Sequence, residues 1–361
     1  MIALCRVLYQ GNSFSTRQPC TIIQSTAFSL FNIVTWQLLV MTSFISEYWS
    51  DLSELFSNSQ QRLYFGYLLC ALIIAFFWLI KSGENVKGSL AKAAGMRQWL
   101  CRSALADYQL IIINKAVFLL LIPLLVTKLS IATAMFELMH QGFSQRSSID
   151  NELPSWLIIS AFTLCIFLLD DLARFYLHKL MHEIPWLWEF HKTHHSATAM
   201  TPLTVLRTHP VEGLIFALRS AFVQGLCIAV FIYFFADKVD LYTVLEVNVL
   251  VFAFNVAGAN LRHSHVPIYY WRWLETIIIS PAQHQIHHSI QPRHFNKNYG
   301  AILAIWDKFC DSHCYSEPQH ALQFGLNRKQ LRSEHHLYSL YFAAFANIYA
   351  SCKRYFQRAS R

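Results

Sequence analysis

The chain has 361 residues, of which 55% are hydrophobic and only 14% charged, whereas a soluble domain has about 25% charged residues. Gly (11) and Pro (10) are sparse, which excludes collagen-like and low-complexity classes. The net charge is +8, but the basic residues are scattered between apolar segments, which favours cytoplasmic loops near anionic lipid over a nucleic-acid groove. We therefore expect a multi-span membrane protein that binds no nucleic acid.

Six apolar segments approach the ~20 residues that a membrane-spanning helix needs. They are expected to be helical, because helices satisfy their own backbone in lipid. In chain order they are 22–45, 63–80, 108–127, 156–169, 214–235 and 241–261. The last two are predicted to form a helical hairpin, with an ion pair between Arg219 and Glu246.

The distribution of Lys and Arg predicts the orientation. Segment 81–107 has five basic residues and segment 46–62 has one, so the positive-inside rule places 81–107 in the cytoplasm. Counting spans onward places 170–213 and everything after 261 on the same side. We expect a multi-pass protein of a bacterial inner membrane or of the endoplasmic reticulum.

Histidines are clustered on this expected cytoplasmic side. One H-x3-H and two H-x2-HH motifs contain His178, His182, His191, His194, His195, His284, His287 and His288. Residues three or four positions apart share one face of a helix, so each motif predicts a stripe of imidazoles. His178 and His182 are expected to continue the helix that begins near Trp156.

The number of imidazoles indicates two metal ions. A structural zinc site uses four ligands and a catalytic site uses three with an open position, so eight suit two adjacent ions. Imidazole binds Zn, Cu, Fe and Ni, so the ligand type alone leaves the metal open.

The order of these motifs resembles the fatty acid hydroxylase/sterol desaturase superfamily of membrane-bound di-iron oxygenases. Further motifs support the resemblance, which covers about residues 156–326: RTHPVE at 207–212, RHSH at 262–265, NYG at 298–300, WD at 306–307 and FGL at 324–326.

The resemblance implies that the eight clustered histidines ligate two irons, which zinc can displace during expression. It implies His263 as an additional ligand, with His265 or His209 as another. For His209, hydrogen bonding that orients a ligand is the alternative. Asp170 and Asp171 are expected either to orient ligand imidazoles or to act as helix caps or partners of Arg174.

The implied reaction is O2-dependent attack on a C–H bond of a lipid, giving an alcohol or an alkene. Sterols, alkylglycerols, acyl chains and carotenoids all remain possible substrates. The sequence has no G-x-G-x-x-G fingerprint, which predicts that electrons come from a separate cytochrome b5, ferredoxin or reductase.

Two other classes of function fit the sequence less well. A membrane zinc hydrolase would favour H-E-x-x-H, but Lys179 follows His178. A metal transporter or metal-binding protein would place ionisable residues at mid-membrane depth, whereas the histidine motifs lie beyond the predicted helix ends.

The predicted fold is all-α: a polytopic membrane helix bundle of four to six spans, with a cytoplasmic helical cap that contains a histidine-rich di-metal site. We divide it into N-terminal spans (1–130), a fatty acid hydroxylase-like di-iron domain (131–330) and a C-terminal interfacial or cap helix (331–361).

Overall fold

The computed structural model describes residues 41–121, 127–142, 153–317, 322–326 and 335–359. The chain divides into two units, Met1–Ser50 and Asp51–Arg361. In the first unit the described residues 41–50 are helical, and most of the expected span 22–45 lies outside the described residues. Everything below concerns the second unit.

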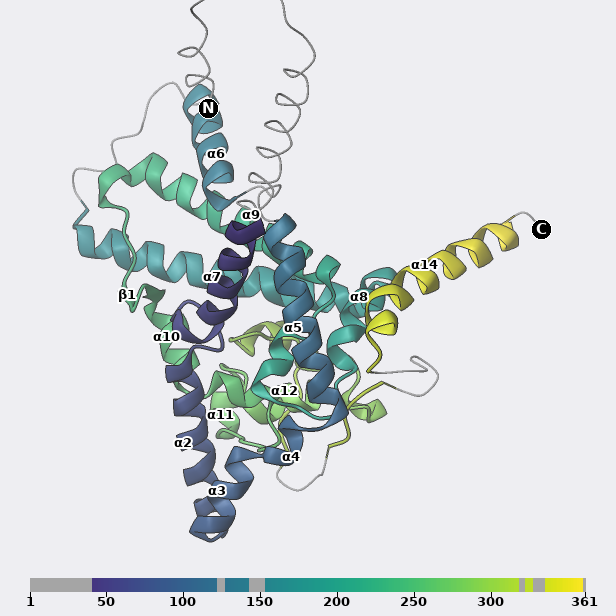
Figure 1. Ribbon diagram of the computed structural model, residues 1–361. Coiled ribbons are helices and arrows are strands. Elements are labelled where there is room, and N and C mark those ends of the chain that lie inside the picture. The colour runs from purple at the N-terminus through teal and green to yellow at the C-terminus, as the bar shows by residue number, and fades with distance from the viewer. Residues whose placement is uncertain (1–40, 122–126, 143–152, 318–321, 327–334, 360–361) are drawn as a thin grey trace, which may run out of the picture. The chain divides into compact units, whose positions relative to one another are not determined.

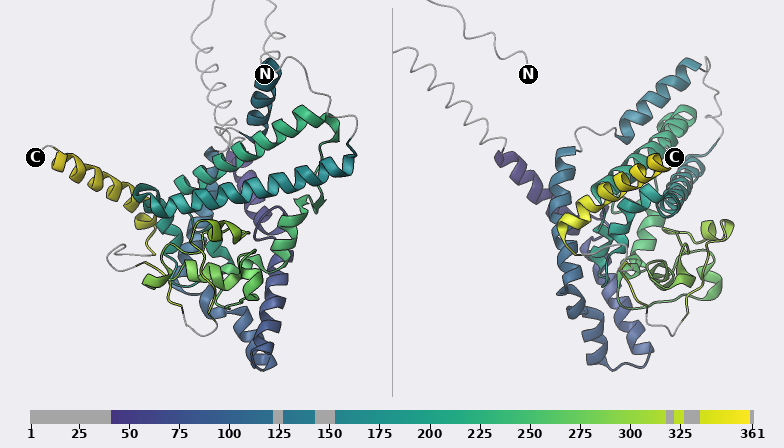
Figure 2. Two further views of the ribbon diagram at one scale, coloured as in Figure 1. Left: turned by 180° about the vertical axis from the view of Figure 1, so that it is seen from behind. Right: turned by 90° about the vertical axis from the view of Figure 1, so that its right-hand side faces the viewer.

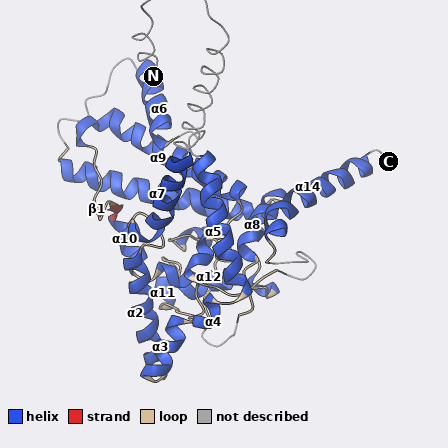
Figure 3. Cartoon of the chain, viewed as in Figure 1, coloured by secondary structure: helices blue, strands red, loops and turns tan. Residues whose placement is uncertain are grey.

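Helices make up most of the second unit (Figures 1 and 3). Its α-helices are α2 (Phe65–Lys81), α3 (Val86–Ala94), α4 (Met96–Trp99), α5 (Arg102–Leu121), α6 (Lys128–Gly142), α7 (Ser155–Glu183), α8 (Pro185–His195), α9 (Pro210–Phe235), α10 (Val249–Val256), α11 (Arg272–Glu275), α12 (Pro281–His287), α13 (Ile305–Phe309) and α14 (Leu337–Ala359). Its 3-10 helices are η3 (Pro202–Leu206), η4 (Ala236–Lys238), η5 (Ala259–His263) and η6 (Pro292–His294). Strands β1 (Thr243–Val244) and β2 (Val247–Asn248) pair antiparallel.

Three described helices, α5, α7 and α9, are long and apolar enough to cross a membrane, and α2 is a shorter apolar helix. The predicted all-α class, with helices suited to a membrane, is thereby confirmed apart from one short strand pair among the described residues, while the number of spans stays a prediction. Helix α7 continues past the apolar segment 156–169 to Glu183, as expected. Its 29 residues extend over about 44 Å, longer than the ~30 Å hydrocarbon core. His178 and His182 lie on its last turns, as predicted.

The predicted helical span 241–261 is wrong. The segment forms the β1–β2 hairpin, the eight-residue helix α10 and then η5. Leu245 and Glu246 adopt left-handed φ angles of 49° and 62° in the hairpin turn, and the Asn248 side chain accepts a hydrogen bond from Leu250 N to begin α10. These polar turns interrupt a segment that is apolar in composition. Without this crossing, the cytoplasmic location of the histidines stays a prediction.

The predicted ion pair between Arg219 and Glu246 is also wrong. Arg219 Nη1 lies 3.0 Å from Asp170 Oδ1 on the neighbouring helix α7. Glu246 instead accepts a hydrogen bond of 3.5 Å from Gln60 Nε2. The charge on α9 is therefore compensated by α7, which runs beside it (Figure 2).

Helix α6 was not predicted, and it packs against α9. Gly225 makes this approach possible, because a Cβ atom there would lie 2.7 Å from Lys128 O and 2.9 Å from Ile131 Cβ. A glycine inside an apolar helix thus marks a close helix–helix contact.

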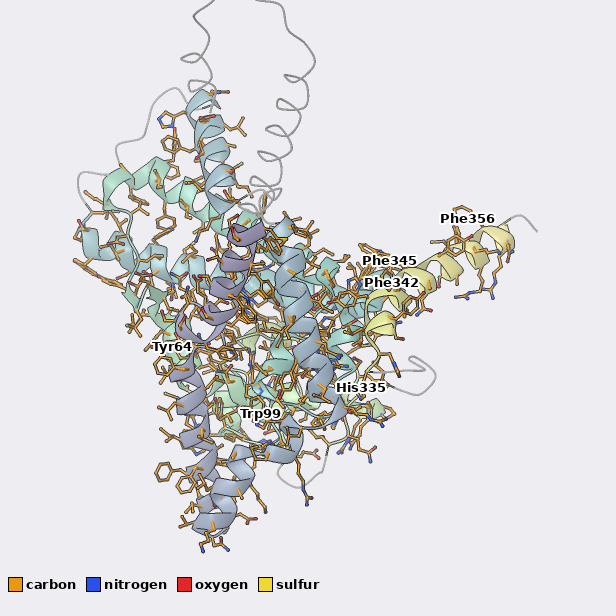
Figure 4. All side chains as sticks on the ribbon, in the orientation of Figure 1. Tyr64, Trp99, His335, Phe342, Phe345 and Phe356 are labelled. Atoms are coloured by element: carbon orange, nitrogen blue, oxygen red, sulfur yellow. The ribbon has the colours of Figure 1, made fainter. Side chains whose placement is uncertain are left out.

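Helix α14 packs with its first turns on α8 and then extends away from the other helices (Figures 1 and 2). Leu340 and Ala344 are buried, whereas Phe342, Phe345 and Phe356 are exposed along the helix (Figure 4). The first part of this helix therefore packs against α8, and its assignment as a cap helix or an interfacial helix stays a prediction.

Candidate metal centre

Nine histidines gather into two groups, within each of which the candidate ligand atoms lie within 4.8 Å of one another. The first group is His178, His182, His191, His195 and His287, and the second is His194, His263, His284 and His288. The structure thus brings together all eight histidines of the three motifs, together with His263. The convergence expected from the sequence is present.

The spacing within each motif explains how two groups form from a few short helices. On α8, His191 and His195 share one face and enter the first group, while His194 enters the second. On α12 the arrangement is reversed, because the pair His284 and His288 enters the second group and His287 the first. An i, i+4 pair and one i+3 residue therefore serve two adjacent sites from a single helix.

The two groups adjoin each other. The rings of His195 and His288, one from each group, are stacked with their centroids 4.4 Å apart. The centroids of the chain neighbours His287 and His288 lie 5.3 Å apart. This proximity suits a two-metal site, in which ions lie about 3.5–4 Å apart.

Burial keeps the imidazoles of this centre neutral. It lowers the pKa of His191 to about 3 and of His194 to about 4, and it lowers the pKa of His263, His284 and His287 well below the ordinary range. A neutral imidazole is the form that binds a metal, so the rings are in the ligand form at pH 7.

In the first group, outer hydrogen bonds orient three of the rings. The Nδ1–H of His178 donates to Tyr299 O at 2.7 Å, and that of His287 donates to Lys297 O at 2.8 Å. His191 Nδ1 lies 2.8 Å from Glu212 Oε1. These contacts fix the tautomer and leave Nε2 as the ligand atom. The buried Nε2 atoms without a hydrogen-bond partner are those of His182, His191, His195 and His287.

In the second group, the Nε2 atoms converge on a common point. His263 Nε2 lies 3.2 Å from His194 Nε2 and 3.0 Å from His284 Nε2, and His288 Nε2 lies 3.2 Å from His284 Nε2. Metal–nitrogen bonds of about 2.0–2.1 Å place neighbouring ligand atoms roughly 3–3.5 Å apart. Both groups therefore fit a bound metal ion.

A loop that contains the NYG and WD motifs positions the carbonyl of Tyr299 beside His178. Asp307 accepts hydrogen bonds from Tyr299 N at 2.8 Å and Gly300 N at 2.7 Å. Asp171 accepts from Ile302 N at 3.0 Å and from Trp306 Nε1 at 2.9 Å. Asp171 thus holds this loop and lies in neither histidine group. Asp170 pairs with Arg174 at 3.0 Å, which confirms the pairing alternative for this residue.

Arg207, completely buried, joins the end of α8 to α5 and was not predicted as a site residue. Its Nε donates to Thr193 O at 3.0 Å, and its Nη1 pairs with Asp107 Oδ1 at 2.7 Å. Glu212 was also missed as a site residue, although both belong to the RTHPVE motif. The signal available in the sequence was the presence of two charged residues, Arg207 and Glu212, in this short motif.

His209 and His265 are placed outside both groups. His209 Nδ1 accepts from Val211 N at 3.1 Å and so caps α9, while its Nε2–H donates to Tyr341 O at 3.0 Å. His265 Nε2 donates to Lys92 O. Both rings thus make structural contacts, and the expectation that either is a ligand is wrong.

Imidazoles in two adjoining groups, beside helices long and apolar enough to cross a membrane, define a histidine-rich membrane protein with a candidate two-metal site. Residues 163–312 match the family model described as fatty acid hydroxylase. This match lies within the segment that carries the resemblance to the fatty acid hydroxylase/sterol desaturase superfamily, and it confirms that resemblance.

The chain is similar to several lipid-modifying enzymes. It is 30% identical to the Delta(7)-sterol 5(6)-desaturase ERG3B of Gibberella zeae over 174 residues, which cover 48% of this chain and 47% of that protein. It is 25% identical to human alkylglycerol monooxygenase over 48% of this chain and 36% of that protein, and 25% identical to human lathosterol oxidase over 49% and 54%. The chain spans about half the length, or less, of these relatives. No solved structure matches it.

Proposed function

We propose that the protein is a membrane oxygenase that uses O2, a pair of irons and externally supplied electrons to hydroxylate or desaturate a C–H bond of a lipid. The observation that supports this proposal best is the pair of adjoining histidine groups inside a segment that matches the fatty acid hydroxylase model. The first group has buried Nε2 atoms without a hydrogen-bond partner, and the Nε2 atoms of the second group converge on one another. Three candidate spanning helices and the names of the relatives support a lipid substrate in a membrane.

The proposed ligands are the nine histidines of the two groups. When bound, the irons supply the activation of O2 that oxidation of an unactivated C–H bond requires. The same imidazoles accept zinc, so a zinc-containing preparation is compatible with an iron enzyme.

The chain itself contributes orientation and exclusion of water. Glu212 and the carbonyls of Tyr299 and Lys297 hold three imidazoles by their Nδ1 atoms, which prevents these rings from turning. Burial of the rings excludes water, which limits side reactions during oxidation.

The relatives favour a sterol or an alkylglycerol as the substrate, because their names include a sterol desaturase, a lathosterol oxidase and an alkylglycerol monooxygenase. An acyl chain or a carotenoid fits the same chemistry. Both products that we consider, an alcohol and an alkene, begin with removal of hydrogen from carbon.

We further propose that the metal centre faces the cytoplasm and takes electrons from a separate cytochrome b5, ferredoxin or reductase. The surplus of basic residues favours docking of an acidic carrier. Turnover with a purified carrier should fall as the salt concentration rises; turnover that does not depend on salt would contradict docking by charge.

Metal analysis and lipid turnover of the purified full chain test the proposed function. We expect about two irons per chain after loading with Fe(II), and an oxidised sterol or alkylglycerol that forms only with O2 and a reductant. Hydrolysis of a lipid without O2 would instead support the zinc hydrolase class. Metal uptake into vesicles without lipid oxidation would support a transporter.

A further inference from the structure

An apolar cavity of about 320 Å³ lies between α2, the α3–α4 segment, η3 and the loop around η5. Its volume is in the range of small-molecule sites, about 300–1,000 Å³. No Asp, Glu, Lys or Arg is among its described lining residues. A second cavity of about 520 Å³ differs, because Asp170, Arg174 and Lys128 line it. The smaller cavity is therefore the one that suits an uncharged hydrocarbon.

The lining of this cavity shares two short chain segments with the histidine groups. Leu261 and Ser264 line the cavity on either side of His263 in the sequence, and His263 Nε2 faces His194 and His284. The lining also includes Met200, five residues after the last histidine of α8. A molecule in the cavity thus lies against the same short segments that position the candidate ligands.

Small side chains on α2 create the space. Ala71 and Ala75, one turn apart, are 3% and 2% exposed and pack with Leu261 and Val266. Both alanines line the cavity, so a larger side chain at either position would occupy its volume.

The cavity borders a face of α2 that is suited to the bilayer. Leu69 and Leu72, which also line the cavity, are 53% and 38% exposed on this apolar helix. A lipid can therefore approach the cavity from the hydrocarbon phase without crossing water.

The wall on the other side of the cavity is fixed in place by His265. Its Nε2–H donates to Lys92 O at the end of α3. Its ring lies so close to Gly95 that a Cβ atom there would be 2.3 Å from Cε1, and Gly95 has a left-handed φ of 58°. This histidine thus fastens the η5 loop to the α3–α4 segment, across the cavity that both elements line.

We propose that this cavity binds an uncharged, non-reacting hydrocarbon part of the lipid substrate, so that the reacting carbon lies at the histidine groups. The inference rests on the proposed function and extends it, because it assigns the site that selects the lipid. The shared chemistry is a hydrocarbon without a charged group, which a sterol ring system and an alkyl chain of an alkylglycerol both supply.

Photo-crosslinking of the full chain in lipid nanodiscs tests the assignment. One arm uses a diazirine-bearing sterol and the other a diazirine-bearing alkylglycerol, and labelled peptides are mapped by mass spectrometry. We expect labelling in 65–81 and 261–266 by at least one probe, and the probe that labels identifies the source of the hydrocarbon. If neither probe labels these peptides, the proposal is wrong.

Substitutions that fill the cavity are compared with a control substitution on the same helix. Ala71→Leu and Ala75→Leu should each lower labelling by about tenfold, which corresponds to about 1.4 kcal/mol. Ile73→Phe adds bulk on the same helix at a position that is 46% exposed and does not line the cavity, so its labelling should stay within about twofold. Unchanged labelling in both alanine variants would overturn the proposal.

The design separates this inference from the proposed function. Labelling needs no O2, electrons or metal, so it reports on the cavity even in a preparation that shows no turnover. If Ala71→Leu or Ala75→Leu fails to fold, a competition experiment on the wild-type protein still tests the proposal. Excess unlabelled lipid should reduce the labelling, because a specific site saturates. A protein that oxidises lipid but is not labelled in these peptides would retain the function and lose the cavity assignment.

Discussion

The two histidine groups are built differently. In the first, Glu212 and two backbone carbonyls hold the Nδ1 atoms of three rings. In the second, the described hydrogen-bond contacts join the rings to one another, and the buried Nδ1 of His284 has no partner. The first group is therefore oriented by the protein before a metal binds, whereas the second depends more on the ion to keep its rings together. Four experiments test this difference between the two groups.

Loss of a ligand should have the largest effect. His191→Ala and His287→Ala should each reduce turnover by at least about 100-fold, since loss of an outer contact alone costs about 10–100-fold. The measurements are lipid turnover and iron content per chain. His336→Ala, outside both groups, is the control. Activity retained in both variants would contradict the ligand assignment.

Loss of the buried ion pair that supports α8 should destabilise both groups together. Arg207→Met leaves Asp107 uncompensated, and both side chains are completely buried, so the free energy of unfolding should fall by about 3–5 kcal/mol. Denaturant titration of the purified protein measures the change. Arg293→Met breaks an exposed pair with Glu317 and should cost less than about 1 kcal/mol. An equal decrease in the free energy of unfolding in the two variants would show that Arg207 does not stabilise the fold more than an exposed ion pair does.

Loss of an outer contact should affect one group only. Glu212→Ala frees the His191 ring and should weaken metal binding at the first group by about 10–100-fold. A competitive chelator titration that resolves two classes of metal measures this. Glu212→Gln, which retains an acceptor oxygen, should recover part of the affinity. An equal loss at both classes would contradict the assignment of Glu212 to the first group.

A change of pH tests whether the imidazoles of the two groups are neutral in the folded protein. The pKa of His191 and of His194 is lowered in the folded protein to about 3 and about 4, from an ordinary value of about 6.5. Below pH ~6.5 the unfolded chain therefore binds more protons, and the free energy of unfolding falls as the pH falls toward these values. Denaturant titrations of the metal-free protein at pH 7.5 and 5.5 should show lower stability at pH 5.5. Higher stability at pH 5.5 would show that these imidazoles are not neutral in the fold.

The centre itself could be predicted because its information is local. The spacing of the three histidine motifs matches the helical repeat, and α7 continues past the apolar stretch to present His178 and His182 as expected. His263 does not follow from this spacing and was expected only from the resemblance, through the RHSH motif at 262–265.

The fold of segment 241–261 and the roles of His209 and His265 depend on contacts between segments that are distant in the sequence. The segment 241–261 has the composition of a span, but Tyr242 N and Asn248 Nδ2 donate to Thr163 on α7, which holds it as a hairpin and a short helix. The contacts of His209 and His265 are likewise with Tyr341 and Lys92, which lie more than a hundred residues away. No periodicity in the sequence reports such partners.

The length of α7 has a consequence for how the protein responds to its membrane. The apolar segment of α7 and the candidate ligands His178 and His182 belong to one continuous helix. A change in the tilt of this helix therefore moves both histidines. A bilayer whose thickness differs from that of the native membrane tilts such a helix, and His178 and His182 then shift relative to the shorter helices opposite. The choice of reconstitution lipid can therefore alter the geometry of the candidate metal centre without any change in the sequence.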